Sequence, residues 1–126
     1  PSASVDLTAL YPQFYDTHHR KVELREDGSA RIIDGITSLL APVNPQFTLL
    51  TTAEIEIAGT HAILTQDGRS LRVTATCNAD LQVSWESAEQ PLRPEDIPYP
   101  GVKRLIIEPQ IRNGDLELTV RLLPVD

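Results

Sequence analysis

The fold is decided by residues 61–77, HAILTQDGRSLRVTATC, in which two alternating runs flank an Asp-Gly pair. From residue 71 to residue 77, apolar side chains alternate with charged or hydroxyl-bearing ones. Successive side chains of a strand point to opposite faces, so this run has one apolar and one solvated face. Asp67-Gly68 tolerates the positive φ of a tight turn. The stretch therefore predicts a hairpin of two strands, 61–66 and 69–77.

The same two-residue period recurs along the chain, and no comparable stretch has the 3.6-residue period of a helix. Asp27-Gly28 and Gly59 mark further turns, and Asn113-Gly114 is a third dipeptide suited to one. The hairpins predicted from them join 19–26 to 29–40 and 53–58 to 61–66. We expect an all-β fold, an antiparallel β-sandwich of about eight or nine short strands, with a closed barrel as the alternative.

At 126 residues the chain has room for one domain, so we expect a single sandwich domain over 1–126. Two segments break the alternation. Residues 1–17 are mixed and predict an initial strand or linker. Residues 87–101 contain four prolines, which lack amide donors, and predict a long proline-rich loop between strands. A chain that starts at Pro1 and has no Met favours a piece of a longer product.

The charge balance excludes two classes of partner. The chain has 11 Lys and Arg against 18 Asp and Glu, a net charge of −7. Such a protein repels nucleic acid and anionic lipid, so we expect neither as a partner. No apolar run approaches the roughly 20 residues of a membrane-spanning helix. The single cysteine, Cys77, is in phase with the apolar side of its strand and is predicted to be a small buried residue.

No group of residues specifies a catalytic, cofactor or metal centre. His18 and His19 near Asp16 are residue types that bind zinc, but neighbours on a strand point to opposite faces. We therefore predict exposed histidines at a strand end. Glu54 and Glu56 share a solvated face, which favours a solubilising pair over the acid and base of a glycosidase. We assign no catalytic residue, no metal ligand and no cofactor.

A sugar site has only weak candidates. Trp85 is in phase with the apolar side of its strand and is predicted to be a core residue. Tyr99, in the proline-rich loop, is the aromatic residue free to stack on a sugar ring. With the cations Arg93 and Lys103, it makes up the set of candidate sugar contacts.

Several short motifs follow one another in an order that resembles a known family. They are DLTALYP at 6–12, HRKV at 19–22, RIID at 31–34, LLTTAEI at 49–55, AILTQDGRSLRV at 62–73 and WESA at 85–88. Together with a closing strand at 116–123, they resemble the C-terminal β-sheet region of the heparinase II/III-like polysaccharide lyases. The resemblance covers about residues 6–123.

This resemblance implies a function without implying a site. In such lyases, Tyr and His of a helical toroid domain carry out β-elimination, and this chain lacks that domain. None of its tyrosines (Tyr11, Tyr15, Tyr99) is therefore assigned that role, and Asp34 is implied to be a structural polar residue at a strand end.

The implied function is that of a non-catalytic C-terminal support domain in a lyase acting on acidic polysaccharides. Its partner would be the catalytic helical domain of the same parent, its contact with polysaccharide would run through that parent, and its location would be periplasmic or secreted. The alternative is an independent carbohydrate-binding or protein-interaction module. An enzyme in its own right is the least favoured alternative, because this segment has no identifiable catalytic centre, whereas the parent chain resembles a polysaccharide lyase.

The closing strand predicts self-association. In the family this region continues a larger sandwich, so on its own it should leave a strand edge or an apolar face exposed. Leu122-Leu123 places apolar side chains on both faces at the end of the strand 116–123. Exposed edges pair with other chains, so we expect a weak homodimer through this strand.

Overall fold

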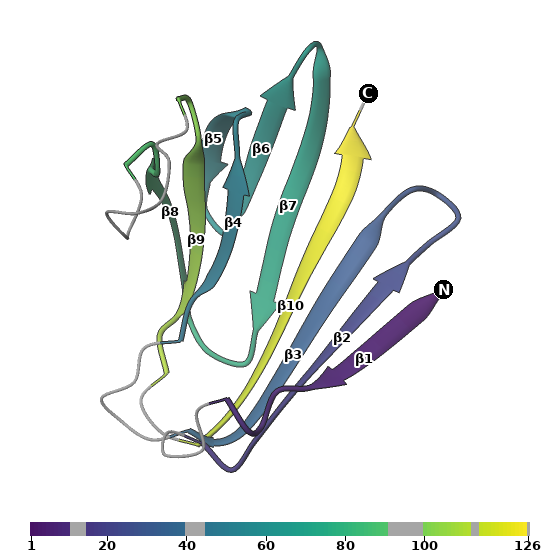
Figure 1. The fold of residues 1–126 in the computed structure, drawn as a ribbon, viewed down its shortest axis with the longest axis vertical. Coiled ribbons are helices and arrows are strands. Elements are labelled where there is room, and N and C mark those ends of the chain that lie inside the picture. The colour runs from purple at the N-terminus through teal and green to yellow at the C-terminus, as the bar shows by residue number, and fades with distance from the viewer. Residues whose placement is uncertain (11–14, 40–44, 91–99, 112–113, 126) are drawn as a thin grey trace.

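The computed structural model describes residues 1–10, 15–39, 45–90, 100–111 and 114–125. Within these ranges the chain has ten strands and no helix, arranged as two antiparallel sheets (Figure 1). This confirms the all-β sandwich, with one or two strands more than expected. No helix in the described ranges has the length and apolar character needed to cross a membrane.

The larger sheet has seven strands in the order β1-β2-β3-β10-β7-β6-β5, and the smaller has three in the order β4-β9-β8. The strands of the large sheet are β1 (Ser2–Asp6), β2 (Thr17–Leu24), β3 (Ala30–Leu39), β5 (Glu54–Ala58), β6 (His61–Gln66), β7 (Arg69–Cys77) and β10 (Gly114–Val125). Those of the small sheet are β4 (Phe47–Thr51), β8 (Leu81–Ser87) and β9 (Lys103–Pro109).

The three predicted hairpins are present. Strand β2 pairs with β3, β5 with β6, and β6 with β7, each antiparallel. At the β6–β7 turn both Asp67 and Gly68 have positive φ, 53° and 76°, which is the conformation that this dipeptide tolerates. The Asn113-Gly114 turn falls partly outside the described residues.

Two glycines give a matched test of turn geometry. Ala at Gly68 must adopt φ +76°, so we expect Gly68→Ala to lower the free energy of unfolding by about 1 kcal/mol. Gly35 lies within β3 at an ordinary φ, and an added Cβ would meet nothing within 4 Å. Gly35→Ala should therefore leave stability unchanged or raise it by up to about 1 kcal/mol. Urea unfolding of both variants measures the difference, and equal losses would contradict the turn assignment.

The hydrophobic core lies between the small sheet and one part of the large sheet. Side chains from β5, β6, β7 and β10 pack against β4, β8 and β9, with Leu105 and Val120 fully buried at the centre. In Figure 1, β8, β9 and β4 lie beside β5–β7, while β3, β2 and β1 extend away on the other side of β10. A second, smaller cluster at one end of the molecule contains Tyr15, Ile36, Leu39 and Leu116.

The expectation that residues 116–123 form an open edge is wrong. They belong to β10, which pairs with β3 on one side and with β7 on the other. Leu123 is 37% exposed on the face of the large sheet that points away from the core. Both backbone edges of β10 are used within the sheet, so this strand has no free edge to offer a second chain.

The apolar inner face of the large sheet continues beyond the core. On β2, Val22 is paired with Ile32 of β3, and Ile32 packs against the core cluster. Val22 and Leu24 therefore face the core side of the large sheet. Ala3 and Val5 on β1 extend that side by one more strand. Val5 is 47% and Leu24 56% exposed. We call Ala3, Val5, Val22 and Leu24 the bare face, because no other strand of the described structure packs over it.

Candidate functional site

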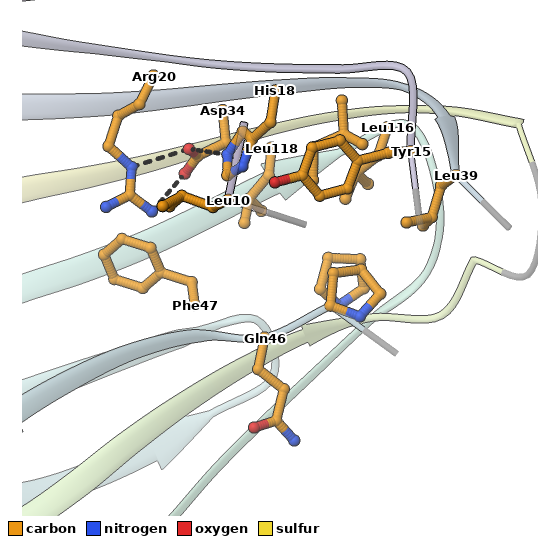
Figure 2. Close-up of a pocket in the computed structure, with 13 residues that line it drawn as sticks. Leu10, Tyr15, His18, Arg20, Asp34, Leu39, Gln46, Phe47, Leu116 and Leu118 are labelled. Atoms are coloured by element: carbon orange, nitrogen blue, oxygen red, sulfur yellow. Dashed lines mark hydrogen bonds and ion pairs between the residues drawn. The ribbon is translucent and has the colours of Figure 1, made fainter. Parts of the chain in front are cut away.

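A mostly apolar hollow of the described structure lies between the two sheets, at the end of the molecule where the smaller core cluster is found. It has a volume of about 340 Å³ and mostly apolar sides (Figure 2). Polar side chains gather on its large-sheet side, where Arg20, Asp34 and His18 lie together. The apolar residues around it are Leu10, Tyr15, Ile36, Leu39, Pro45, Phe47, Pro109, Leu116 and Leu118, and Gln46 completes the lining.

A buried carboxylate organises the polar side of this cavity. Arg20 donates from Nε to Oδ1 of Asp34 at 2.8 Å and from Nη2 to Oδ2 at 3.2 Å, and His18 Nε2 lies 2.9 Å from Oδ1. Only 6% of the Asp34 side chain is exposed. Strand register explains the cluster: Arg20 is the direct partner of Asp34, and His18 lies two residues along the same face. The carboxylate is thereby satisfied without solvent.

Two sequence-based expectations are corrected here. Asp34 lies in the middle of β3, paired on both sides, and not at a strand end. His18 is not an exposed histidine, since only 17% of its side chain is accessible. His19, its neighbour, does point to the opposite face, where its Nδ1 lies 3.9 Å from Asp6 Oδ1. The two imidazoles cannot reach a common ion from opposite faces of one sheet.

Aromatic contacts connect this polar cluster to the rest of the end of the sandwich. Tyr15 donates its hydroxyl hydrogen to the Leu7 carbonyl at 3.0 Å, and its ring meets that of His18 edge-on, with centroids 5.6 Å apart. The Arg20 guanidinium lies 5.7 Å from the centroid of the Phe47 ring, which belongs to the small sheet. This cation–π contact joins the two sheets across the cavity.

The arrangement supports structure and binding more directly than catalysis. A nucleophile with its base requires a hydroxyl or thiol hydrogen-bonded to the imidazole, and none of the described side-chain hydrogen bonds of His18 is of that kind. Within the described residues, no three side chains of His, Cys, Asp or Glu form a metal-binding group. An apolar cavity with one polar side suits a small, mostly apolar ligand that carries a hydrogen-bonding group.

The candidate sugar contacts do not come together in the described structure. Tyr99 and Arg93 lie outside the described residues. Lys103 is half-buried on β9 and donates from Nζ to the Ala53 carbonyl at 3.1 Å, so it holds the turn before β5. The Lys103 ammonium therefore already has a hydrogen-bond acceptor within the fold.

Trp85 differs from expectation in its burial. It has the predicted phase, because it is paired with the fully buried Leu105 and faces the same side. It is nevertheless 44% exposed, since β8 is an edge strand of the small sheet. Cys77 has the predicted phase, since it packs beside both core clusters, but it is half-buried and not buried as predicted. Glu54 and Glu56 are exposed, as predicted.

A second hollow, of about 740 Å³, lies on the outer face of the large sheet around Gly35. Its lining includes the ionisable side chains Asp6, His19, Lys21 and Glu117. The Thr8 hydroxyl and backbone N–H hold the pKa of the Asp6 carboxyl below its usual range. Both acidic and basic side chains line the hollow, so it favours neither an anionic nor a cationic ligand.

The His18–Arg20–Asp34 cluster was not predicted from the sequence. Its signal was weak: His18 and Arg20 are two residues apart on one strand, and Asp34 lies in an apolar context on the next. Only the register of the β2–β3 hairpin shows that the three meet. The chain matches no protein-family model and no curated protein, so its function has to be argued from this geometry.

Proposed function

We propose that this chain is a non-catalytic β-sandwich support module, the C-terminal module of a heparinase II/III-like lyase acting on acidic polysaccharides. The observation that carries the proposal is the bare face. Its four side chains continue the apolar core side of the large sheet onto β2 and β1, where no described strand packs over them. An apolar sheet face of this kind is suited to packing on another domain.

The energetics favour a packed neighbour over solvent. Burying a Val or Leu side chain fully stabilises a contact by roughly 1.5–3 kcal/mol, and Val5 and Leu24 are each about half accessible. We assign the catalytic helical domain of the same parent protein as the neighbour. A chain with a net charge of −7 is a poor direct holder of a polyanion, so it would meet the acidic substrate only through that parent.

A matched pair of substitutions in the parent protein tests this role. Leu24 on the bare face is 56% exposed, and Leu50 on the outer face of the small sheet is 61% exposed. We expect Leu24→Asp to lower the Tm of the parent and its lyase activity, because a carboxylate would enter the domain contact. Leu50→Asp should change neither.

The readouts are calorimetry of the parent and the near-ultraviolet absorbance of the unsaturated uronate that elimination forms. The isolated 126-residue chain should form none from heparin, heparan sulfate or alginate. Product formed by the purified chain alone would contradict a non-catalytic role. Equal effects of the two substitutions would contradict packing through the bare face.

The alternative, an independent carbohydrate-binding module, has one observation in its favour. Sugar-binding sandwiches present exposed aromatic rings, and Trp85 is 44% exposed. Retention of the isolated chain on an immobilised neutral glycan, lost in Trp85→Ala with unchanged circular dichroism, would favour that alternative. A coding sequence that supplies no helical domain upstream would favour it as well.

A further inference from the structure

Strand β1 is an unprotected edge of the described sandwich. The four edge strands of the two sheets are β1, β5, β4 and β8, and β1 alone has every residue exposed. Strand β5 carries Glu54 and Glu56, and β8 carries Glu86. Such charges on an edge strand disfavour pairing with a strand of another chain. Strand β1 reads Ser-Ala-Ser-Val-Asp, with small side chains, no proline and one charge, at its end. Nothing in this strand discourages pairing with another strand.

The backbone groups that β1 turns outward can be assigned from its ladder. The Leu24 N–H donates to the Pro1 carbonyl at 2.9 Å, and the Leu7 N–H donates to the His18 carbonyl at 2.7 Å. Hydrogen-bonded pairs alternate along an antiparallel ladder, so Ala3 and Val5 also direct their backbone groups toward β2. The N–H and C=O groups of Ser2, Ser4 and Asp6 therefore point away from the sheet.

We propose that β1 pairs antiparallel with β1 of a second copy of this chain, in a two-fold dimer centred on Ser4. In this register Ser4 faces its own copy, and Ser2 faces Asp6 of the other copy. All three outward-facing residues on each strand then exchange backbone hydrogen bonds, two for each pair. A register centred on Asp6 would instead place two carboxylates opposite each other, which is destabilising.

The side chains fit this register on both faces. On the outer face, the serine hydroxyls meet at the axis, and each Asp6 lies between its own His19 and the Ser2 of the other copy. On the core-facing side, Val5 gains Ala3 of the other copy as a neighbour, and the apolar surface becomes continuous across the two copies. The contact is confined to one strand edge, so it should be weak. It does not depend on the proposed lyase role, which rests on a face and not on this edge.

Sedimentation of the purified chain over a concentration series tests the dimer. We expect reversible dimerisation, and at least a tenfold rise in the dissociation constant for Ser4→Pro. Proline at Ser4 removes an N–H that points outward, a position where edge strands tolerate it, so the fold should persist by circular dichroism. Ser4→Lys, which places two ammonium groups at the axis, is a second variant if the proline perturbs folding. Leu123→Lys is the control and should dimerise like the wild type, because β10 has no free edge.

Cysteine cross-linking tests the register, with Cys77 replaced by alanine in every variant. Hydrogen-bonded antiparallel partners have Cα atoms about 5.5 Å apart, within the range of a disulfide. Ser4→Cys should form a covalent dimer on oxidation, whereas Ser2→Cys should not, because its partner is Asp6. A monomer at all concentrations would overturn the proposal, as would a dimer that survives Ser4→Pro and Ser4→Lys but is lost in Leu24→Lys. Equal cross-linking of both cysteine variants would overturn the Ser4-centred register.

Discussion

Replacing Asp34 by alanine should lower the free energy of unfolding by about 3 kcal/mol, the lower end of the range for breaking a buried ion pair. The substitution leaves the Arg20 guanidinium and the His18 imidazole without the carboxylate that both contact. The lower end applies because 36% of the Arg20 side chain is exposed, so water recovers part of its solvation. Chemical unfolding of the purified chain measures the change.

The control for this substitution is Asp80→Ala, which removes an exposed carboxylate and should change stability by no more than about 0.5 kcal/mol. Asp34→Asn keeps an acceptor for Arg20 and should fall between the two. If Asp34→Ala unfolded at the same denaturant concentration as Asp80→Ala, the carboxylate would not be what holds β2, β3 and Phe47 together.

Leu105→Ala should destabilise the chain by about 2–5 kcal/mol, because it opens a cavity at the centre of the core. Leu105 has no exposed surface and lies on the middle strand of the small sheet, facing β7 and β10. Leu50 lies on the neighbouring strand β4 but is 61% exposed, so Leu50→Ala makes the same chemical change outside the core and should cost less than about 1 kcal/mol. Thermal unfolding compares the two variants, and similar losses would contradict the assignment of the inner face.

Local signals explain why the hairpins could be predicted. The β6–β7 and β2–β3 pairs depend on alternation and on an Asp-Gly turn, both visible within about twenty residues of sequence. The place of β10 could not be predicted in this way. It pairs with β3, more than seventy residues away, and with β7, and no local pattern records which distant strand it joins.

The polar cluster and Trp85 show the same limit at the level of side chains. Alternation places Asp34 on an inner face but does not say that Arg20 lies opposite, because that needs the register across the turn. Trp85 follows the alternation as well, yet its exposure depends on β8 being an edge strand, which is a property of the whole sheet. The sequence predicts which face of its strand a side chain lies on, but not what packs against that face.

The central place of β10 governs the order in which the chain can fold. Strands β1–β3 form one meander and β5–β7 another, each made of neighbours in sequence that can pair soon after synthesis. The two meanders share no ladder except through β10, which enters between β3 and β7. During translation we therefore expect β3 and β7 to keep one unpaired edge each until the twelve residues of β10 have emerged and can pair with both. A chaperone that shields β3 and β7 during that interval would act on the step where aggregation competes most directly with folding.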